Sequence, residues 1–252
     1  MVLAHPRLTA LLAGLLAVVA LAGCQQSPSP SPAPPTTTAS VITEPTHSDL
    51  PTAVPNAALS VTDINWYQGD ASWTVAGLVT NNTTQAYNGV TLAIVLLDDE
   101  GNTRPSGTAY LLVDAIAPGE SMPFVWSGDG MLPAHARVAA EVVGKDPANL
   151  ARAVLDVENA HLVRAADGIV LLTGELVNHT AQPVLLSNLA AAVFAADGHI
   201  LSAAYGEADL THYAPGARGS FQIAINTTPG LAAEIHDFRI YPDAQTDEAR
   251  QP

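Results

Sequence analysis

The stretch that decides the fold reads Gly77-Leu78-Val79-Thr80-Asn81-Asn82-Thr83, and Gly174-Glu175-Leu176-Val177-Asn178-His179-Thr180 matches it 97 residues later. From Trp73 to Asp146 the match keeps one register without a gap and holds 13 identities in 74 positions. We infer that the chain contains two copies of one domain. The other matched pairs include Gln85 and Gln182, Leu92 and Leu189, Gly101 and Gly198, Ala117-Pro118-Gly119 and Ala214-Pro215-Gly216, Phe124 and Phe221, and Asp146 and Asp243.

Each copy has the pattern of an all-β domain. Trp73 to Thr80 is rich in β-branched and aromatic residues and ends at a turn of Asn and Thr. Val90 to Leu97 is an apolar run too short for a typical helix, and Gly89 and Asp98 bound it. Roughly six or seven short strands per copy is the rhythm of an immunoglobulin-like sandwich. The fold class predicted is therefore all-β, with two tandem immunoglobulin-like β-sandwich domains.

The second copy repeats the pattern, with strands predicted at Ile169 to Val177, Leu189 to Phe194 and Ile235 to Tyr241. Pro147 to Val157 also fits a helix by its apolar spacing. The repeat instead places the first strand of copy two at about Leu155 to Arg164. We therefore expect that strand, with at most a helical turn at Pro147 to Ala151.

The matched residues have structural explanations. A glycine inside a strand, as at Gly77 and Gly174, usually marks a bulge or the close approach of another segment. Asn81 and Asn178 can bond their own backbone and tolerate positive φ, and the alternative is a ligand-contacting loop. The remaining matched residues are predicted turn residues or core anchors: Gly101, Pro118, Gly119, Gly198, Pro215 and Gly216 in turns, and Phe124 and Phe221 in the core.

The amino-terminal segment has the features of an export signal. Leu8 to Leu21 is an apolar run after the single basic residue Arg7, and it is too short to cross about 30 Å of hydrocarbon. It ends in Leu21-Ala22-Gly23-Cys24, which closely resembles the bacterial lipobox. That resemblance implies a diacylglycerol thioether on Cys24, further acylation such as palmitate, and cleavage before Cys24. Two or more acyl chains would hold the chain stably on a membrane.

Between Cys24 and the repeats lies a stretch rich in Pro, Ser and Thr. Proline lacks the backbone N–H and fixes φ, so we expect a disordered, polyproline-like linker. The predicted organisation is a signal peptide at 1–23, the lipidated cysteine and linker at 24–55, sandwiches at 56–147 and 148–245, and a disordered tail at 246–252. The predicted location is the extracytoplasmic face of a cell membrane, or the outer membrane if the organism has one.

The repeat motifs resemble a known family. Gly-x-Val/Leu-x-Asn, an apolar strand ending in Asp-x-x-Gly, and Ala-Pro-Gly before a Phe strand look like the FxLYD domain, a small immunoglobulin-like module of bacterial and archaeal surface proteins. The naming motif corresponds to Ile94-Val95-Leu96-Leu97-Asp98, which keeps two of its four specified positions, and to Ala191-Ala192-Val193-Phe194-Ala195, which keeps none. The resemblance implies an extracytoplasmic module without a catalytic constellation.

Charge and cysteine content exclude some classes of function. Beyond the signal, 24 acidic and eight basic residues give a net charge of −16, which repels nucleic acid and anionic headgroups. With Cys24 as its one cysteine, the chain forms no intrachain disulfide. We therefore expect no nucleic-acid partner and stability that comes from core burial.

No motif in the sequence specifies chemistry. There is no His-Glu-x-x-His, no nucleophile elbow and no phosphate loop, so no catalytic, cofactor or metal residue is assigned. Two alternatives stay open: His199, His212 and His236 could meet in space, and Trp66 with Tyr67 could form a surface aromatic patch instead of packing into the core.

The hypothesis that follows is a lipid-anchored, non-catalytic binding or structural lipoprotein of the cell envelope. Its partner would be a protein or a polysaccharide of unknown identity. The alternatives are an envelope metal-dependent enzyme with a site between the domains, and a small-molecule receptor for a transporter. Tandem repetition favours the first hypothesis, because duplicated modules add reach and valency.

Overall fold

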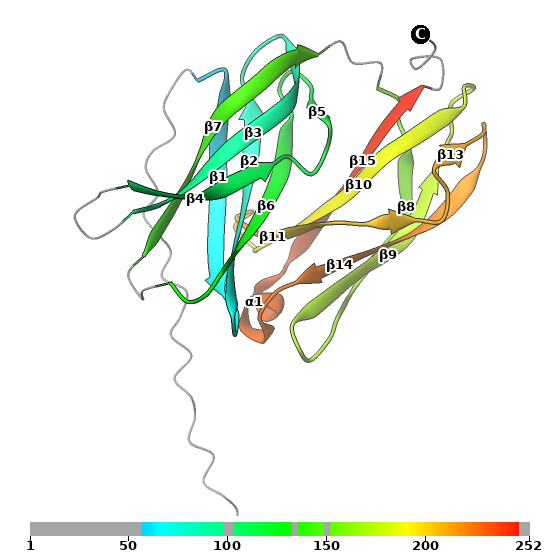
Figure 1. Ribbon diagram of the computed structural model, residues 1–252. Helices are drawn as coiled ribbons and strands as arrows, with labels where there is room; N and C mark the ends of the chain where they lie inside the picture. The colour runs from blue at the N-terminus through cyan, green and yellow to red at the C-terminus, as the bar shows by residue number, and fades with distance from the viewer. Residues whose placement is uncertain (1–56, 98–102, 133–135, 149–151, 247–252) are drawn as a thin grey trace, which may run out of the picture. The chain divides into compact units, whose positions relative to one another are not determined.

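Two β-sandwiches follow one another in the computed structural model, which describes residues 57–97, 103–132, 136–148 and 152–246 (Figure 1). In the first sandwich, here the first module, β2 pairs with both β1 and β6 in one sheet, and β3 pairs with β4, β5 and β7 in the other. Its strands are β1 (Leu59–Gln68), β2 (Ser72–Asn81), β3 (Ala86–Leu97), β4 (Thr103–Tyr110), β5 (Ala115–Ile116), β6 (Ser121–Asp129) and β7 (Arg137–Ala148).

The second module repeats this plan. One sheet has the order β12-β14-β9-β8, and in the other β10 pairs with β11, β13 and β15. In both modules the chain crosses to the second sheet and back, as in an immunoglobulin-like sandwich. Its elements are β8 (Asp156–Arg164), β9 (Ile169–Val177), β10 (Val184–Phe194), β11 (Ile200–Tyr205), β12 (Glu207–Ala208), β13 (His212–Tyr213), β14 (Arg218–Asn226), α1 (Pro229–Glu234) and β15 (Asp237–Thr246).

Strand register confirms most of the repeat alignment. Gly77 pairs with Phe124 and Gly174 with Phe221, so both β2–β6 and β9–β14 keep the spacing of 97 residues. The pairings β3–β5 and β10–β13 also agree, and β3–β4 and β10–β11 agree on either side of their bulges, which lie at different positions in the two modules. The strand expected at about Leu155 to Arg164 is β8, which begins one residue later.

The alignment is wrong at the last strand of each copy. Ile94 pairs with Ala140, whereas its counterpart Ala191 pairs with Ile240, so β15 is displaced by three residues from the repeat spacing. Asp146 and Asp243 are therefore not equivalent. The short helix α1 precedes β15, and the Thr228 hydroxyl caps it by accepting a hydrogen bond from Leu231 N. The segment between β14 and β15 is longer than the one between β6 and β7, which displaces β15 from the spacing of 97 residues.

The expected helical turn at Pro147 to Ala151 is also not observed where the structure describes the chain. Pro147 and Ala148 belong to β7, in which they pair with Tyr87 and Ala86. Residues 149–151 lie outside the described ranges.

Each module buries its own core around a phenylalanine and a glycine. Phe124 and Phe221 are buried, and each lies directly across from a strand glycine in the neighbouring strand. A Cβ atom on Gly77 would lie 2.5 Å from the Phe124 ring and 2.6 Å from the Asp63 carbonyl oxygen; on Gly174 it would lie 2.8 Å from the Phe221 ring. The close approach predicted for both glycines is therefore confirmed.

Replacing Gly77 with alanine should destabilise the first module by about 1–3 kcal/mol, because the added methyl group overlaps an aromatic ring and a backbone oxygen. Urea unfolding measures this loss of free energy. The control is Gly144→Ala, whose new Cβ would meet its nearest neighbour, Thr91 Cβ, at 3.4 Å. Equal losses for the two variants would contradict the proposed ring contact.

Candidate functional site

The two matched asparagines tie a strand end to the turn of the opposite sheet. Asn81 and Asn178 are fully buried. The Asn178 amide nitrogen donates to the carbonyl oxygens of Gln182 and Tyr213, each at 2.8 Å, and its Oδ1 accepts from the Thr180 N–H at 2.9 Å. Asn81 repeats these bonds with Gln85, Ile116 and Thr83. Neither has positive φ, contrary to one of the explanations offered from sequence.

The Ala-Pro-Gly segments form the turns that these asparagines meet. Gly119 N and Gly216 N donate to the backbone oxygens of Asn81 and Asn178, and both glycines have positive φ. Pro118 and Pro215 precede them in these turns. The matched residues therefore support the fold through hydrogen bonds within each module.

Gly198 is one of the glycines that the sequence predicted to lie in a turn. Gly198 lies in the turn between β10 and β11 with φ of +86°, where a glycine is favoured. Gly101 and Cys24 lie outside the described residues.

The two modules contact each other, and the sequence did not predict this contact. Ala76 and Leu78 of β2 are buried in one cluster with Ala192, Phe194 and Ile200 of the second module. In β2 these two residues alternate with Val75 and Val79, which face the first module's own core. Both faces of this strand are therefore buried, one within its module and one against the next.

Polar contacts from β1 hold one side of this contact. Asp63 Oδ1 lies 2.6 Å from His199 Nδ1, and Asp63 Oδ2 accepts from the Ile200 N–H at 2.6 Å. Asn65 donates to the Leu201 carbonyl oxygen at 3.1 Å, and Tyr67 donates to that of Asn226 at 2.6 Å. The edge strand of one module is thus bonded to β11 and the end of β14 in the other.

A second polar group holds another part of the contact. Asp243 of β15 is buried and accepts from the Asp114 N–H at 2.6 Å, and Asn188 donates to the Asp114 carboxylate at 2.7 Å. Burial raises the pKa of Asp243. Arg152, between the modules in sequence, pairs with Glu120 of the first module. Buried apolar side chains and charge-assisted hydrogen bonds together indicate that the modules are coupled, rather than joined by a free linker.

The aromatic pair left open by the sequence belongs to the interior. Trp66 is half-buried and packs against the first core, as the core-packing interpretation predicted. Tyr67 packs against the core of the second module, and burial raises the pKa of its hydroxyl. These two side chains therefore do not form the surface aromatic patch considered as an alternative.

The three histidines of the second module do not gather. His199 faces Asp63, the His212 ring lies 3.1 Å from the Thr211 hydroxyl, and His236 N donates to the Phe194 carbonyl oxygen. Among the residues described, no three His, Cys, Asp or Glu side chains are close enough together to hold a metal ion. In the same residues, no helix has the length and apolar character to cross a membrane.

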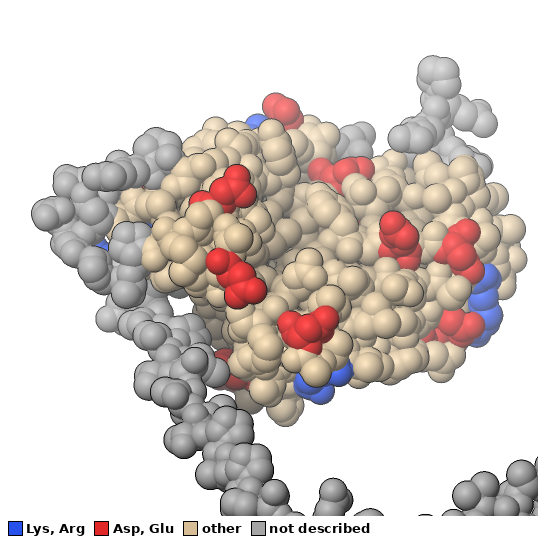
Figure 2. Space-filling view, turned by 60° about the horizontal axis from the view of Figure 1, so that its bottom comes forward, with Lys and Arg blue, Asp and Glu red and all other residues tan. Residues whose placement is uncertain are grey.

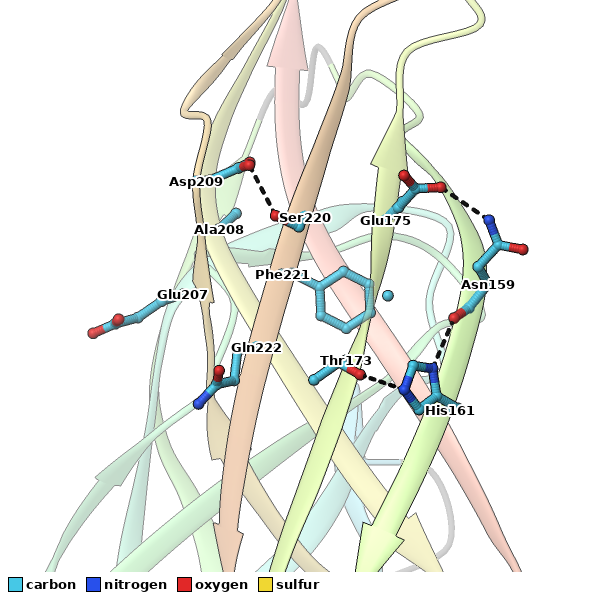
Figure 3. A pocket seen from close by; sticks show the side chains of 11 residues that line it. Asn159, His161, Thr173, Glu175, Glu207, Ala208, Asp209, Ser220, Phe221 and Gln222 are labelled. Atoms are coloured by element: carbon cyan, nitrogen blue, oxygen red, sulfur yellow. Dashed lines mark hydrogen bonds between the residues drawn. The ribbon is translucent and has the colours of Figure 1, made fainter. Parts of the chain in front are cut away.

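Two adjoining grooves mark the surface of the second module. The first, of about 590 Å³, is hollowed over β8, β9, β12 and β14 (Figure 3). The second, of about 580 Å³, lies between β10 and the segment after β11, beside the half-exposed Tyr205. Glu207 and Ala208 line both grooves. The visible surface carries more acidic than basic side chains (Figure 2), as the sequence charge requires.

None of the known protein families matches this chain, and neither does any curated protein. Among solved structures, the tandem CBM22-1 and CBM22-2 domains of Xyn10C from Paenibacillus barcinonensis are similar at 12% identity, covering 80% of this chain and 88% of that one, with a TM-score of 0.13. A likeness of that size carries no argument about function.

The stability of the module contact should depend on pH through His199. Its pKa is raised because the ring hydrogen-bonds to Asp63, and the charges of Asp63 and Asp197 add to this while burial opposes it. The protonated ring therefore stabilises the folded chain fully below the ordinary histidine pKa of about 6.5, and this contribution is lost as pH rises through the raised pKa.

As the pH rises from about 6.5 through the raised pKa of His199, we expect the free energy of unfolding of the wild-type chain to fall. The free energy of unfolding of the His199→Gln variant should fall by less over the same pH range. Urea titrations at several pH values measure the difference. His161→Gln serves as the control, since His161 lies on an exposed face and bonds within its own module. Parallel pH profiles for wild type and His199→Gln would contradict this assignment.

Proposed function

We propose that this chain is a lipid-anchored lipoprotein of the cell envelope that acts as a non-catalytic binding or structural module. The observation that carries the proposal is the sequence Leu21-Ala22-Gly23-Cys24 at the end of an apolar run, followed by a proline-rich linker and two sandwiches. In this arrangement Cys24 carries the acyl chains, and the linker separates the modules from the membrane surface. The repeat motifs favour FxLYD-like modules.

Coupling between the modules supports a structural or binding role. The contact is filled by apolar side chains and bonded on two sides, which favours presentation of the two modules to a partner as a single unit. An enzyme of the metal-dependent kind would need a cluster of ligands between the modules. Instead, the carboxylates described there, Asp63, Asp114 and Asp243, each bond to backbone N–H groups or side chains across the contact.

The adjoining grooves are the part of the surface proposed for a partner. Both are lined by hydrogen-bonding groups, and Glu207 lies at their junction. An aromatic side chain, Tyr205, stands at the rim of the second groove with 54% of its surface exposed. Such a combination fits a protein loop or a polysaccharide, the two partner classes expected from the sequence.

Replacing Cys24 with serine tests the anchor. Each buried methylene of an acyl chain contributes about 0.8 kcal/mol, so loss of the thioether should move the chain from the membrane to the soluble fraction and abolish labelling by palmitate. Cell fractionation and metabolic labelling measure both effects, with Ser27→Ala as the control. Unchanged palmitate labelling in Cys24→Ser would exclude this attachment site.

Cross-linking the full chain in its native envelope tests the binding role. We expect one dominant partner, recovered at least about tenfold less well from Glu207→Lys because the charge reversal places a cation where both grooves meet. Glu141→Lys, at an exposed position of β7, is the matched control. Equal recovery from both variants would remove the grooves from the proposal.

A further inference from the structure

The same sheet face is used differently in the two modules. In the first module the outer face of β1, β2 and β6 is covered by the second module. In the second module the corresponding outer face belongs to β8, β9 and β14, and the first groove hollows it. We call this second surface the open face; the polar residues of its three strands that line the groove are Asn159, His161, Thr173, Glu175, Ser220 and Gln222.

Strand register fixes which residues correspond. Because Gly77–Phe124 and Gly174–Phe221 are equivalent pairs, three residues of the covered face each have a counterpart 97 residues later. All three lie in the apolar contact between the modules, and all three are replaced by polar residues on the open face. The pairs are Ala76 and Thr173, Leu78 and Glu175, and Val125 and Gln222.

The edge strands also differ, because β8 lacks the side chains with which β1 reaches the other module. Asn65 pairs with Ala76, and His161 pairs with Thr173, so His161 occupies the place of Asn65. Asn65 reaches across to the other module, whereas the His161 ring bonds to Thr173 Oγ1 at 2.9 Å on its own sheet. By the same correspondence Val163 stands where Tyr67 stands in the first module, and it has no hydroxyl to donate.

The polar side chains of the open face bond to one another (Figure 3). Asn159 donates to Glu175 at 2.9 Å, Arg218 donates to Glu175 at 3.0 Å, and Ser220 donates to Asp209 at 2.9 Å. A module seated here would desolvate the Glu175 carboxylate and the Gln222 amide without offering the apolar match that Leu78 and Val125 have.

We propose that the open face is a module-docking face closed to a second copy of this chain by its polar side chains. The backbone repeats a surface that already seats a module, and the replaced residues leave this second surface without an apolar match for another module. The contact between the modules joins two different surfaces and is therefore heterologous. If the open face were apolar, copies of the chain could associate through it head to tail, and the assembly would have no fixed size. Polar outer faces serve this purpose at the ends of repeat arrays.

The test restores the first module's residues in the full chain: Thr173→Ala, Glu175→Leu and Gln222→Val. Sedimentation in detergent should show a monomeric wild-type chain and a variant whose self-association is at least about tenfold tighter than any association detected for the wild-type chain. The control Thr173→Ser, Glu175→Gln, Gln222→Asn keeps the face polar and should behave as wild type. Circular dichroism and thermal unfolding establish that each variant is folded.

The single substitution Glu175→Leu is the second variant, because it changes one side chain of the open face and leaves the backbone pairing of the strands unchanged. It should associate more weakly than the triple variant and more strongly than wild type. A folded triple variant that stays monomeric would overturn the proposal, and so would a wild-type chain that associates through this face. Neither outcome bears on membrane anchoring through Cys24, so the two proposals fail separately.

Discussion

In each module, the contact between a phenylalanine ring and a strand glycine determines the register of the strands, and the other features of the structure depend on that register. Phe124 and Phe221 fill the volume that a Cβ atom would take on Gly77 and Gly174. Because ring and glycine must lie directly across from each other, this contact fixes the register of β2 on β6 and of β9 on β14. A slip of one residue would turn every side chain of those strands to the opposite face. The buried asparagines and their Ala-Pro-Gly turns then follow at the strand ends.

Register decides which side chains meet the other module. With Val75 and Val79 facing the first core, Ala76 and Leu78 must face outward, where they would expose apolar surface without a neighbour. Small side chains such as alanine let another sheet approach closely, and Asp63, Asn65 and Tyr67 supply hydrogen bonds along the edge of the contact. The coupling of the modules is thus a consequence of strand pairing inside the first one.

The fold was predictable because its constraints are local or repeated. Glycine, asparagine and Ala-Pro-Gly recur with one spacing, which predicted two copies of one domain, and the pairings of β2 with β6 and of β9 with β14 keep that spacing. The last strand was misaligned because α1 and its cap change the chain length between β14 and β15, and a six-residue helix leaves little periodic signal. The module contact was not predictable, since Asp63 and His199 are far apart in sequence and match nothing in the other copy.

The two copies differ most where their surroundings differ. Interior positions keep their residue types because close packing tolerates few volumes, as the paired glycines and phenylalanines show. The outer face has no such internal constraint, and its residue types match what covers it. At the three equivalent positions the residues are alanine, leucine and valine where a module covers the face, and threonine, glutamate and glutamine where water does. One backbone plan therefore carries both versions, and at the positions equivalent to the module contact the second face has polar side chains that bond to one another.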